Sequence, residues 1–158
     1  MSQRYPDLHQ HLEALKRAGL LVTVDRPINK DTELHPLVRW QFRGGIEERS
    51  RKAFLFTNVV DSKGKRYDIP VVVGALAASR EIYRMGMGCP LERINETWNR
   101  AIANPIAPNL VQEAPCHDLV FQGKTLDGNG LESLPIPIST PGWDIAPFTT
   151  LSQYITRD

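Results

Sequence analysis

Apolar side chains recur at helical spacing in four stretches of the chain. Near the N-terminus, Leu8, Leu12 and Leu15 fall on one stripe of a helix. This stripe predicts a helix between residues 7 and 18, and Gly19 is suited to cap its C-terminal end because glycine adopts positive φ without strain.

The three later helical stretches are each bounded by capping or breaking residues. One is predicted to be capped by Asp31-Thr32 and to end at Gly44-Gly45, with apolar positions at Leu34, Leu37, Val38 and Trp40. Another runs from Ser79 to Gly86. The last begins at Pro90 and carries one apolar face, formed by Leu91, Ile94, Trp98 and Ile102.

Strand patterns lie between these helices. A β-branched run covers residues 20–24, and residues 53–60 and 68–74 predict two strands joined by the polar turn 61–66. Residues 71–73 are all valine, and apolar residues without alternation indicate a strand covered on both faces. Residues 1–104 therefore predict an α/β (α+β) layered domain, for which we expect a core containing Leu8, Leu12, Leu15, Leu55, Val72, Ile94 and Trp98.

The pattern changes near residue 104. Residues 117–122, 134–138 and 148–156 are short, proline-bounded and strand-like, without helical periodicity. We expect residues 105–158 to be the start of a β-rich domain, the first strands of an incomplete split β-barrel. Because this part has few bulky apolar residues, it is expected to be held mainly by packing on the front domain or by pairing with another copy of the chain.

Composition and charge narrow the class of protein. The 158 residues are 41% hydrophobic and 23% charged, which is typical of a globular protein. The net charge of +1 gives no electrostatic reason to expect nucleic acid or an anionic membrane as a partner. The charge is uneven: residues 1–100 carry 17 Lys and Arg against 12 Asp and Glu, and residues 101–158 carry 2 against 6. Two widely spaced cysteines and the lack of an eighteen-residue apolar run predict a reduced, cytoplasmic location with no membrane span.

Most motifs with a chemical interpretation have a simpler structural one. Gly86-Met87-Gly88 follows a predicted helix rather than a strand, so a turn is favoured over a dinucleotide site. The strand, glycine and capped helix of residues 71–79 could hold an anion on backbone N–H groups, but every strand-to-helix connection shares this feature. The basic loop 43–52 is interrupted by Glu47 and Glu48 and predicts a solvated loop.

The histidines and helix carboxylates likewise favour structural roles. His9 and His11 point to different faces of one helix, and His35 and His117 stand alone, so surface or capping roles are predicted for all four. Glu92 and Glu96 share a helix face with Arg93 and Arg100 within reach, which is typical of exposed helix charges.

Residues 131–157 contain the most conformationally constrained segment. Pro135 and Pro137 favour an extended backbone, Pro141-Gly142 a turn, and Trp143-Asp144 follows. This density of constraints fits either a rigid structural element or a site-forming loop, and the sequence does not choose between them.

Residues 114–158, APCHDLVFQGKTLDGNGLESLPIPISTPGWDIAPFTTLSQYITRD, resemble the entry to the flavin-binding domain of UbiD-type decarboxylases. The shared features are an Ala-Pro start, Leu-x-x-Leu-Pro-Ile, a loop Asp and a strand ending in Thr-Arg-Asp. Earlier segments agree in order: ELHPLVRW, AFLFTNVV and IPVVVGALAASREIYRMGMG. The resemblance covers nearly the whole chain and is most specific at its C-terminal end.

The resemblance implies an enzyme that adds or removes CO₂ on aromatic or α,β-unsaturated acids. Members of the family use prenylated FMN, with a divalent metal (Mn or Mg) and potassium, and the cofactor supplies an electron sink for the carbanion. The family's metal-binding Asn, catalytic Arg and two catalytic Glu follow the Thr-Arg-Asp strand end, so no catalytic, cofactor or metal residue is assigned here. Asp144, Thr149 and Thr150 are predicted as pocket wall, while residues 143–147 depart from the family's glycine-rich loop and put the substrate class in doubt.

Three hypotheses follow. The first is the N-terminal part of a UbiD-like carboxy-lyase that is a homo-oligomer when full length, acts on a small carboxylic acid, and is inactive as this isolated chain, which binds neither flavin nor metal tightly. The second is a stand-alone, non-catalytic subunit or interaction module. The third, flavin binding without decarboxylation, is weaker because no phosphate-binding loop is persuasive.

Overall fold

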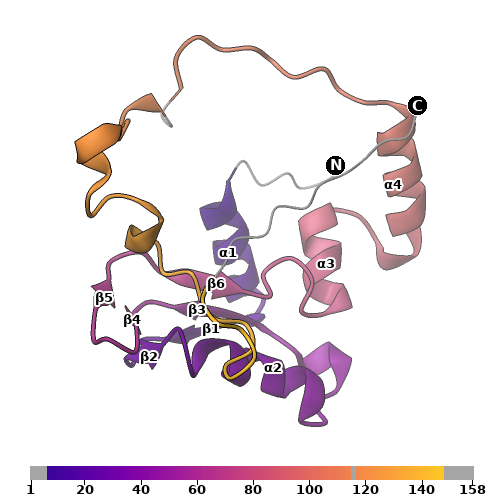
Figure 1. The fold of residues 1–158 in the computed structure, drawn as a ribbon. Helices are drawn as coiled ribbons and strands as arrows, with labels where there is room; N and C mark the ends of the chain where they lie inside the picture. The colour runs from indigo at the N-terminus through magenta and orange to yellow at the C-terminus, as the bar shows by residue number, and fades with distance from the viewer. Residues whose placement is uncertain (1–6, 115–116, 148–158) are drawn as a thin grey trace.

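The computed structural model describes residues 7–114 and 117–147. The front part alternates helices and short strands (Figure 1): α1 (Leu8–Arg17), β1 (Leu21–Val24), β2 (Ile28–Asn29), α2 (Leu34–Arg43), β3 (Ala53–Phe56), β4 (Val59–Val60), β5 (Arg66–Tyr67), β6 (Val71–Val73), α3 (Arg80–Met87) and α4 (Ile94–Ala103). Short 3-10 helices cover Glu48–Ser50, Leu91–Arg93, Gly123–Leu126 and Leu131–Ser133. None of the helices in the described ranges is both long and apolar enough to cross a membrane.

The strands form two small three-stranded sheets. In the first, the order is β1-β3-β6, with β1 parallel and β6 antiparallel to β3. In the second, the order is β2-β4-β5, with β2 parallel and β5 antiparallel to β4. The single strand predicted for residues 53–60 is thus divided between the two sheets, and β5 lies partly within the predicted turn.

The division occurs at Thr57 and Asn58. These residues form hydrogen bonds with the end of β1, the β1–β2 connection and the start of β2. The Thr57 N–H donates to the Val24 carbonyl at 3.0 Å, and the Asn58 carbonyl accepts from the Ile28 N–H at 3.0 Å. The Asn58 side-chain amide also donates to the Asp25 carbonyl at 3.2 Å. A strand that changes partners in this way belongs to two sheets, which the strand pattern of residues 53–60 did not indicate.

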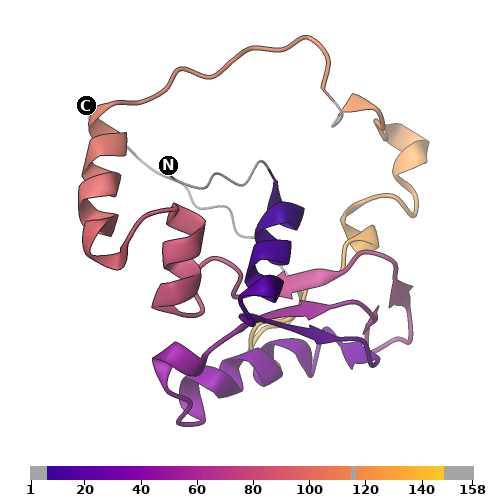
Figure 2. The ribbon, with the colours of Figure 1, turned by 180° about the vertical axis from the view of Figure 1, so that it is seen from behind.

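Helices cover both faces of the first sheet, α1 on one face and α2 on the other (Figures 1 and 2). Alternate residues of β3 and β6 therefore enter different core clusters. Val71 and Val73 pack against the cluster on the α2 side, built on Ile28, Leu34, Val38, Phe56, Val59 and Tyr67. Val72 packs against the other cluster, built on Leu15, Ala53, Ala75, Ala78 and Ile82. The mixed α/β architecture and the two-sided covering of residues 71–73 are confirmed.

Both ends of α1 and the start of α3 follow the sequence, whereas α3 continues past its predicted end at Gly86 to Met87, and α2 does not start as predicted. Asp7 and Ser79 each accept a backbone hydrogen bond as N-caps, and Gly19 adopts a φ of +69° after α1. The predicted Asp31-Thr32 cap is wrong, because α2 begins after Glu33, without a side-chain cap. The Asp31 side chain instead contacts Lys30 and Ser62.

The predicted core list is correct only in part. Leu15 is fully buried, and Leu12, Leu55, Val72 and Ile94 are half-buried, whereas Leu8 is 50% exposed and Trp98 47% exposed. In α1 the buried residues are His11, Ala14 and Leu15, so the inner face is rotated away from Leu8.

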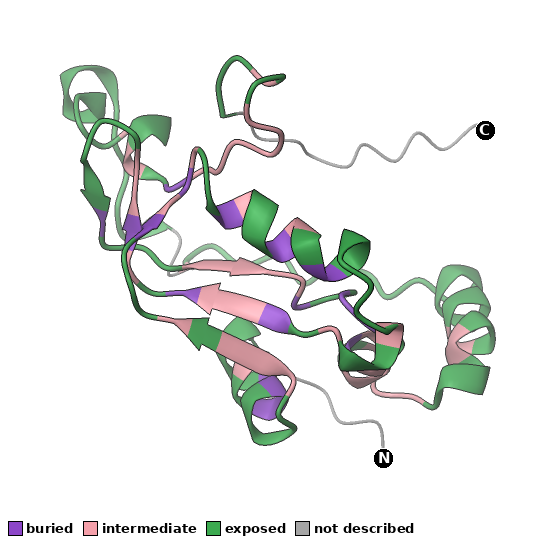
Figure 3. Ribbon diagram, turned by 90° about the horizontal axis from the view of Figure 1, so that it is seen from below, coloured by how far each residue is buried: buried purple, intermediate pink, exposed green. Residues whose placement is uncertain are grey.

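The back part contains no strand in its described residues. Residues 105–114 and 117–129 arc away from the sheets and are exposed almost throughout, and the chain then returns to the front part (Figures 1 and 3). The strands predicted for residues 117–122 and 134–138 are therefore wrong for this structure, because no neighbouring strand pairs with either segment. The third, at 148–156, lies outside the described residues, and the split β-barrel is not confirmed.

Candidate functional site

A cleft of about 550 Å³ lies where the chain returns to the front part. We call residues 131–147 the returning segment. One wall of the cleft contains charged residues from the end of β2 and from the β4–β5 turn. The other wall contains apolar residues of the returning segment, including Leu134, Ile136 and Ile138. The cleft therefore combines a polar face with an apolar one.

Lys30 and Asp31 form the most buried charged pair in the wall of this cleft. Lys30 is 5% exposed, and its Nζ atom lies 2.6 Å from Asp31 Oδ1. Asp31 Oδ2 also accepts a hydrogen bond from the Ser62 N–H at 3.0 Å. Burial raises the pKa of the Asp31 carboxyl, but the hydrogen bonds from Lys30 and Ser62 outweigh this effect, and the net pKa is below its usual range.

Asp61 organises the β4–β5 turn on the same wall. Its Oδ1 atom accepts the N–H groups of Lys63 and Lys65, at 2.9 and 2.8 Å, and its Oδ2 atom accepts the Tyr67 hydroxyl at 3.2 Å. Desolvation raises the pKa of Asp61, but these hydrogen bonds bring it below its usual range. Burial, followed by the hydrogen bond to Asp61, raises the pKa of Tyr67.

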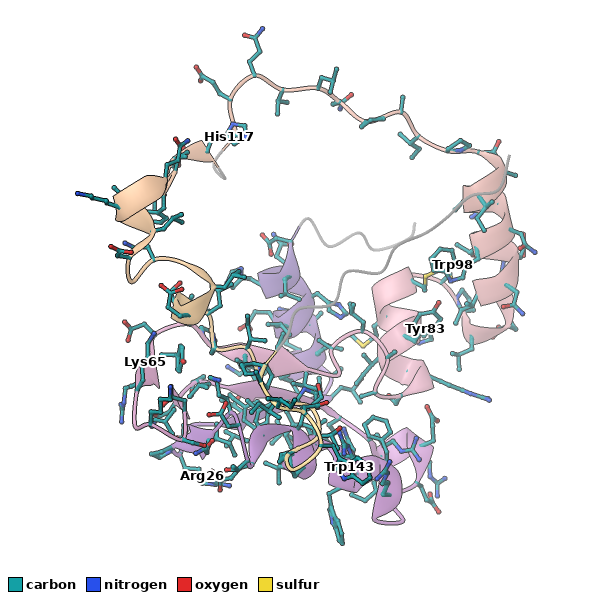
Figure 4. The ribbon with its side chains drawn as sticks, in the orientation of Figure 1. Arg26, Lys65, Tyr83, Trp98, His117 and Trp143 are labelled. Atoms are coloured by element: carbon teal, nitrogen blue, oxygen red, sulfur yellow. The ribbon has the colours of Figure 1, made fainter. Side chains whose placement is uncertain are left out.

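These groups are suited to hydrogen bonding and ion pairing rather than to proton transfer. At neutral pH, Asp31 and Asp61 stay ionised and Tyr67 stays protonated, because each pKa is shifted away from neutrality. Lys65 contacts the face of the Tyr67 ring at 4.8 Å, and its Nζ atom donates to the Glu132 carbonyl at 2.7 Å (Figure 4). The Lys65 side chain thus connects the β4–β5 turn to the returning segment across the cleft.

Asp144 is the only predicted pocket-wall residue that the structure describes. Its Oδ2 atom accepts the Thr140 N–H at 2.7 Å, and its own N–H donates to the Thr140 carbonyl at 3.0 Å. Asp144 therefore closes a turn, and the cleft is lined by the residues that follow it, Ile145, Ala146 and Pro147. Thr149 and Thr150 lie outside the described residues.

Arg39 is a contact residue that the sequence analysis did not single out. It lies on α2, and its guanidinium donates to the Ser139 carbonyl and to Thr140 Oγ1, the second contact being 3.3 Å long. Arg39 also affects its neighbour one turn earlier: burial, followed by the charge of Arg39, lowers the pKa of His35. No local spacing signals a contact across a hundred residues.

The anion site considered at the start of α3 is occupied by the chain itself. Ser79 Oγ accepts the Ile82 N–H at 3.3 Å, and a carboxylate oxygen of Glu48 accepts the Arg80 N–H. Gly88 caps α3 with a φ of +61°, which confirms the turn interpretation at Gly88, whereas Gly86 and Met87 belong to the last turn of the helix. The structural interpretation of this region is therefore favoured over the ligand-binding one.

The other candidate side chains also have structural partners. His11 is buried, not at the surface as predicted, and its Nε2 atom lies 2.7 Å from the Ala75 carbonyl oxygen. Arg93 pairs with Glu96 at 3.1 Å, as expected for exposed helix charges. Within residues 7–114 and 117–147, no three His, Cys, Asp or Glu residues gather as a metal-binding group.

Comparison with known proteins supports the resemblance. The family model described as 3-octaprenyl-4-hydroxybenzoate carboxy-lyase N-terminal domain matches residues 12–102, more than half of the chain. The apo structure of a 3,4-dihydroxybenzoic acid decarboxylase from Enterobacter cloacae is 30% identical, with a TM-score of 0.68 over 88% of this chain and 29% of that chain.

Two structures of a second enzyme agree. The UbiD-class enzyme HmfF from Pelotomaculum thermopropionicum, in complex with FMN, is 29% identical, with a TM-score of 0.62 over 82% of this chain and 26% of that chain. An evolved dimeric form of HmfF, in complex with prFMN, is 27% identical, with a TM-score of 0.61 over 82% of this chain and 27% of that one. This chain therefore spans between 26% and 29% of the lengths of these enzymes.

Proposed function

This chain belongs to the UbiD family of carboxy-lyases, and we propose that it is the N-terminal part of a decarboxylase that acts on an aromatic or α,β-unsaturated carboxylic acid. The observation that carries this proposal is the extent of the similarity. The match to the 3,4-dihydroxybenzoic acid decarboxylase covers 88% of the chain, so it extends beyond the residues 12–102 matched by the family model.

We propose that residues 1–104 are the N-terminal α/β domain and that residues 105–158 begin the flavin-binding domain. Two features support this division. The strands and both core clusters of the described residues lie before residue 104, and net positive charge in the front part changes to net negative charge in the back part. In this proposal the front domain is a scaffold on which the flavin-binding domain is positioned.

We propose prenylated FMN, with a divalent metal and potassium, as the cofactor set of the complete enzyme, by analogy with HmfF, which has been solved with FMN and with prFMN. When bound, such a flavin accepts the electron pair released as CO₂ departs. The described residues contain no three-residue metal-binding group, so none is assigned to the metal or the flavin and no step is derived through them. Asp144, with Thr149 and Thr150, is proposed to line the pocket wall.

The complete enzyme is proposed to act in the cytoplasm as a homo-oligomer on a small carboxylic acid, without nucleic acid or membrane as partner. The isolated chain is proposed to be inactive, because the resemblance places the catalytic Asn, Arg and Glu residues after Thr156-Arg157-Asp158.

The test compares two purified proteins from the same gene: the 158-residue chain and the product of the longest reading frame that contains it. We expect CO₂ release from aromatic or α,β-unsaturated acids, together with flavin absorbance, only for a product carrying the additional catalytic residues. CO₂ release by the 158-residue chain above a control without enzyme would overturn the inactivity of the isolated chain. A reading frame that stops after residue 158 and encodes a protein without activity would favour the stand-alone module.

A further inference from the structure

The returning segment is the only described part of the chain after residue 104 that becomes substantially buried. Residues 105–114 and 117–129 are exposed almost throughout, whereas Pro135 is buried and residues 136–141 are half-buried (Figure 3). The segment lies in front of α2 and the sheets in Figure 1 and behind them in Figure 2, on the α2 side of the fold. The segment has no helix or strand between residues 134 and 139 that could bury its own side chains. Its burial therefore comes from contact with the front part.

Three elements of the front part together form the surface that receives the segment. At the end of β2, an edge strand, the Lys30 carbonyl accepts the Ile138 N–H at 3.2 Å. From the β4–β5 turn, the Lys65 ammonium donates to the Glu132 carbonyl at 2.7 Å. From α2, Arg39 reaches the Ser139 carbonyl and the Thr140 hydroxyl.

The contacts suit an extended chain rather than a particular side chain. Lys65 and Arg39 both donate to main-chain carbonyls, which need a donor when their segment lacks a pairing strand. Pro135 and Pro137 have no N–H, so the segment presents few unpaired donors to this surface. Lys65 and Arg39 belong to the front part, which carries net positive charge, and the segment belongs to the back part, which carries net negative charge. The two parts that meet here therefore have opposite net charges.

We propose that this surface, formed by the end of β2, the β4–β5 turn and α2, is the docking surface for residues 131–144, and that Arg39 is a positioning residue for catalysis. The guanidinium holds a permanent charge and several donors in a rigid plane, so one side chain fixes two neighbouring residues. The Thr140 that it contacts is also the residue that Asp144 closes into a turn. Arg39 thereby fixes the turn of residues 140–144 against α2, and it acts on the pocket wall only through this turn.

The role in catalysis rests on the proposed function, but the docking itself does not, so the two are tested separately. The first experiment uses hydrogen exchange on the 158-residue chain with Arg39→Ala, Arg39→Lys and, as a control, Arg43→Ala. Arg43 is an exposed residue of the same helix, and its side chain makes no hydrogen bond or ion pair with the described residues. The readout is the exchange rate of the amides of Ile138, Thr140 and Asp144, which donate to Lys30, Asp144 and Thr140.

We expect Arg39→Ala to accelerate exchange at these three amides on the order of tenfold, the effect of losing a hydrogen bond from a charged group. Arg39→Lys should accelerate them less, and Arg43→Ala should leave them unchanged. Amides of β3 and β6 should be unchanged in all three variants. Unchanged exchange at residues 138–144 in Arg39→Ala, or equal acceleration in β3, would overturn the docking proposal.

The second experiment uses the complete enzyme with the same three variants. We expect Arg39→Ala to lower kcat on the order of tenfold and to change the absorbance spectrum of the bound flavin, while the melting temperature of the front domain changes little. Partial recovery in Arg39→Lys would support positioning through charge and hydrogen bonding. Accelerated exchange with unchanged kcat and spectrum would overturn the positioning role. If the complete enzyme has no decarboxylase activity, the proposed function fails while the exchange result still decides the docking.

Discussion

Two helices of equal length, α2 and α4, differ in how far they are buried in this fold. Each has ten residues and an apolar stripe, but α2 buries Leu34, Val38 and Gln41, whereas α4 buries no residue. The difference lies in what each helix faces. Leu34 and Val38 enter the core cluster on the α2 side of the sheets. The apolar side chains of α4 have no sheet beside them, and Ile102 is 71% exposed.

The connection of α4 to the rest of the molecule is narrow. The Trp98 indole N–H donates to the Tyr83 hydroxyl of α3 at 2.6 Å, and both side chains lie between the two helices (Figure 4). A stripe of apolar residues therefore predicts that a helix forms and which of its faces is apolar, but not that the face has a partner within the same domain. Substitutions in α2, at the cap of α3 and in α4 test this contrast.

The largest effect is expected inside α2. Leu34 is fully buried, so Leu34→Ala should lower the free energy of unfolding of the 158-residue chain by about 2–5 kcal/mol through lost burial and a residual cavity. Leu37→Ala, three residues along the same helix but at a 37% exposed position, should cost less than about 1 kcal/mol. Urea titration followed by circular dichroism measures both, and equal losses would contradict the burial assigned to α2.

A smaller effect is expected at the turn that leads from α3 toward α4. Gly88 has a φ of +61°, so Gly88→Ala should destabilise the chain by about 1–2 kcal/mol. Gly86→Ala is the matched control, because a Cβ there would have only an ordinary contact, 3.8 Å from a His11 ring carbon. Inside α3 it should stabilise by about 0.5–1 kcal/mol. Changes of the same sign in the two variants, measured by urea titration, would refute the assigned cap.

His35 on α2 is expected to make the free energy of unfolding depend on pH. Burial and the charge of Arg39 lower the pKa of His35 in the folded protein, so the unfolded chain binds a proton there more readily. Stability should therefore fall as the pH decreases below about 6.5, the pKa of an unperturbed histidine, and level off below the folded pKa. In His35→Asn the slope of stability against pH between pH 7 and 5 should be smaller than in the original chain. An unchanged slope would show that His35 does not contribute.

The smallest effect is expected on the outer face of α4. Because Ile102 is largely exposed, Ile102→Ser should change the free energy of unfolding by no more than about 0.5 kcal/mol. Val38→Ser, at a buried position of α2, should cost about 2 kcal/mol or more. A comparable loss in the two variants at low protein concentration would mean that α4 is packed in solution, and the contrast between the helices would fail.

Local features of the fold were predictable because their causes are local. The start of α3 at Ser79 and the glycine end of α1 at Gly19 were predictable from adjacent residues, and β3 and β6 pair across the predicted polar turn. The division of residues 53–60 between two sheets was not predictable, because Thr57 and Asn58 are set by hydrogen bonds to Val24 and Ile28, which lie some thirty residues earlier.

The candidate site shows the same limit more strongly. The sequence indicated that residues 131–144 are conformationally constrained and named Asp144, but it gave no sign of Arg39 or of the buried Lys30–Asp31 pair. Asp31 was expected to cap a helix, since a carboxylate before a helical pattern usually does so. The neighbouring Lys30 and the Ser62 N–H compete for the same oxygens, and that competition exists only after β2 and β4 have come together.

By itself, the sequence determined the existence of the four helices, the mixed α/β character of the front part, and the family to which the chain belongs. These properties depend on spacings of a few residues or on the order of short motifs. Only the tertiary structure decided that α2 is buried and α4 exposed, that His11 faces inward on α1, and that Arg39 contacts residues 139 and 140. These outcomes depend on which surfaces meet across long separations in the chain, and no local pattern encodes that choice.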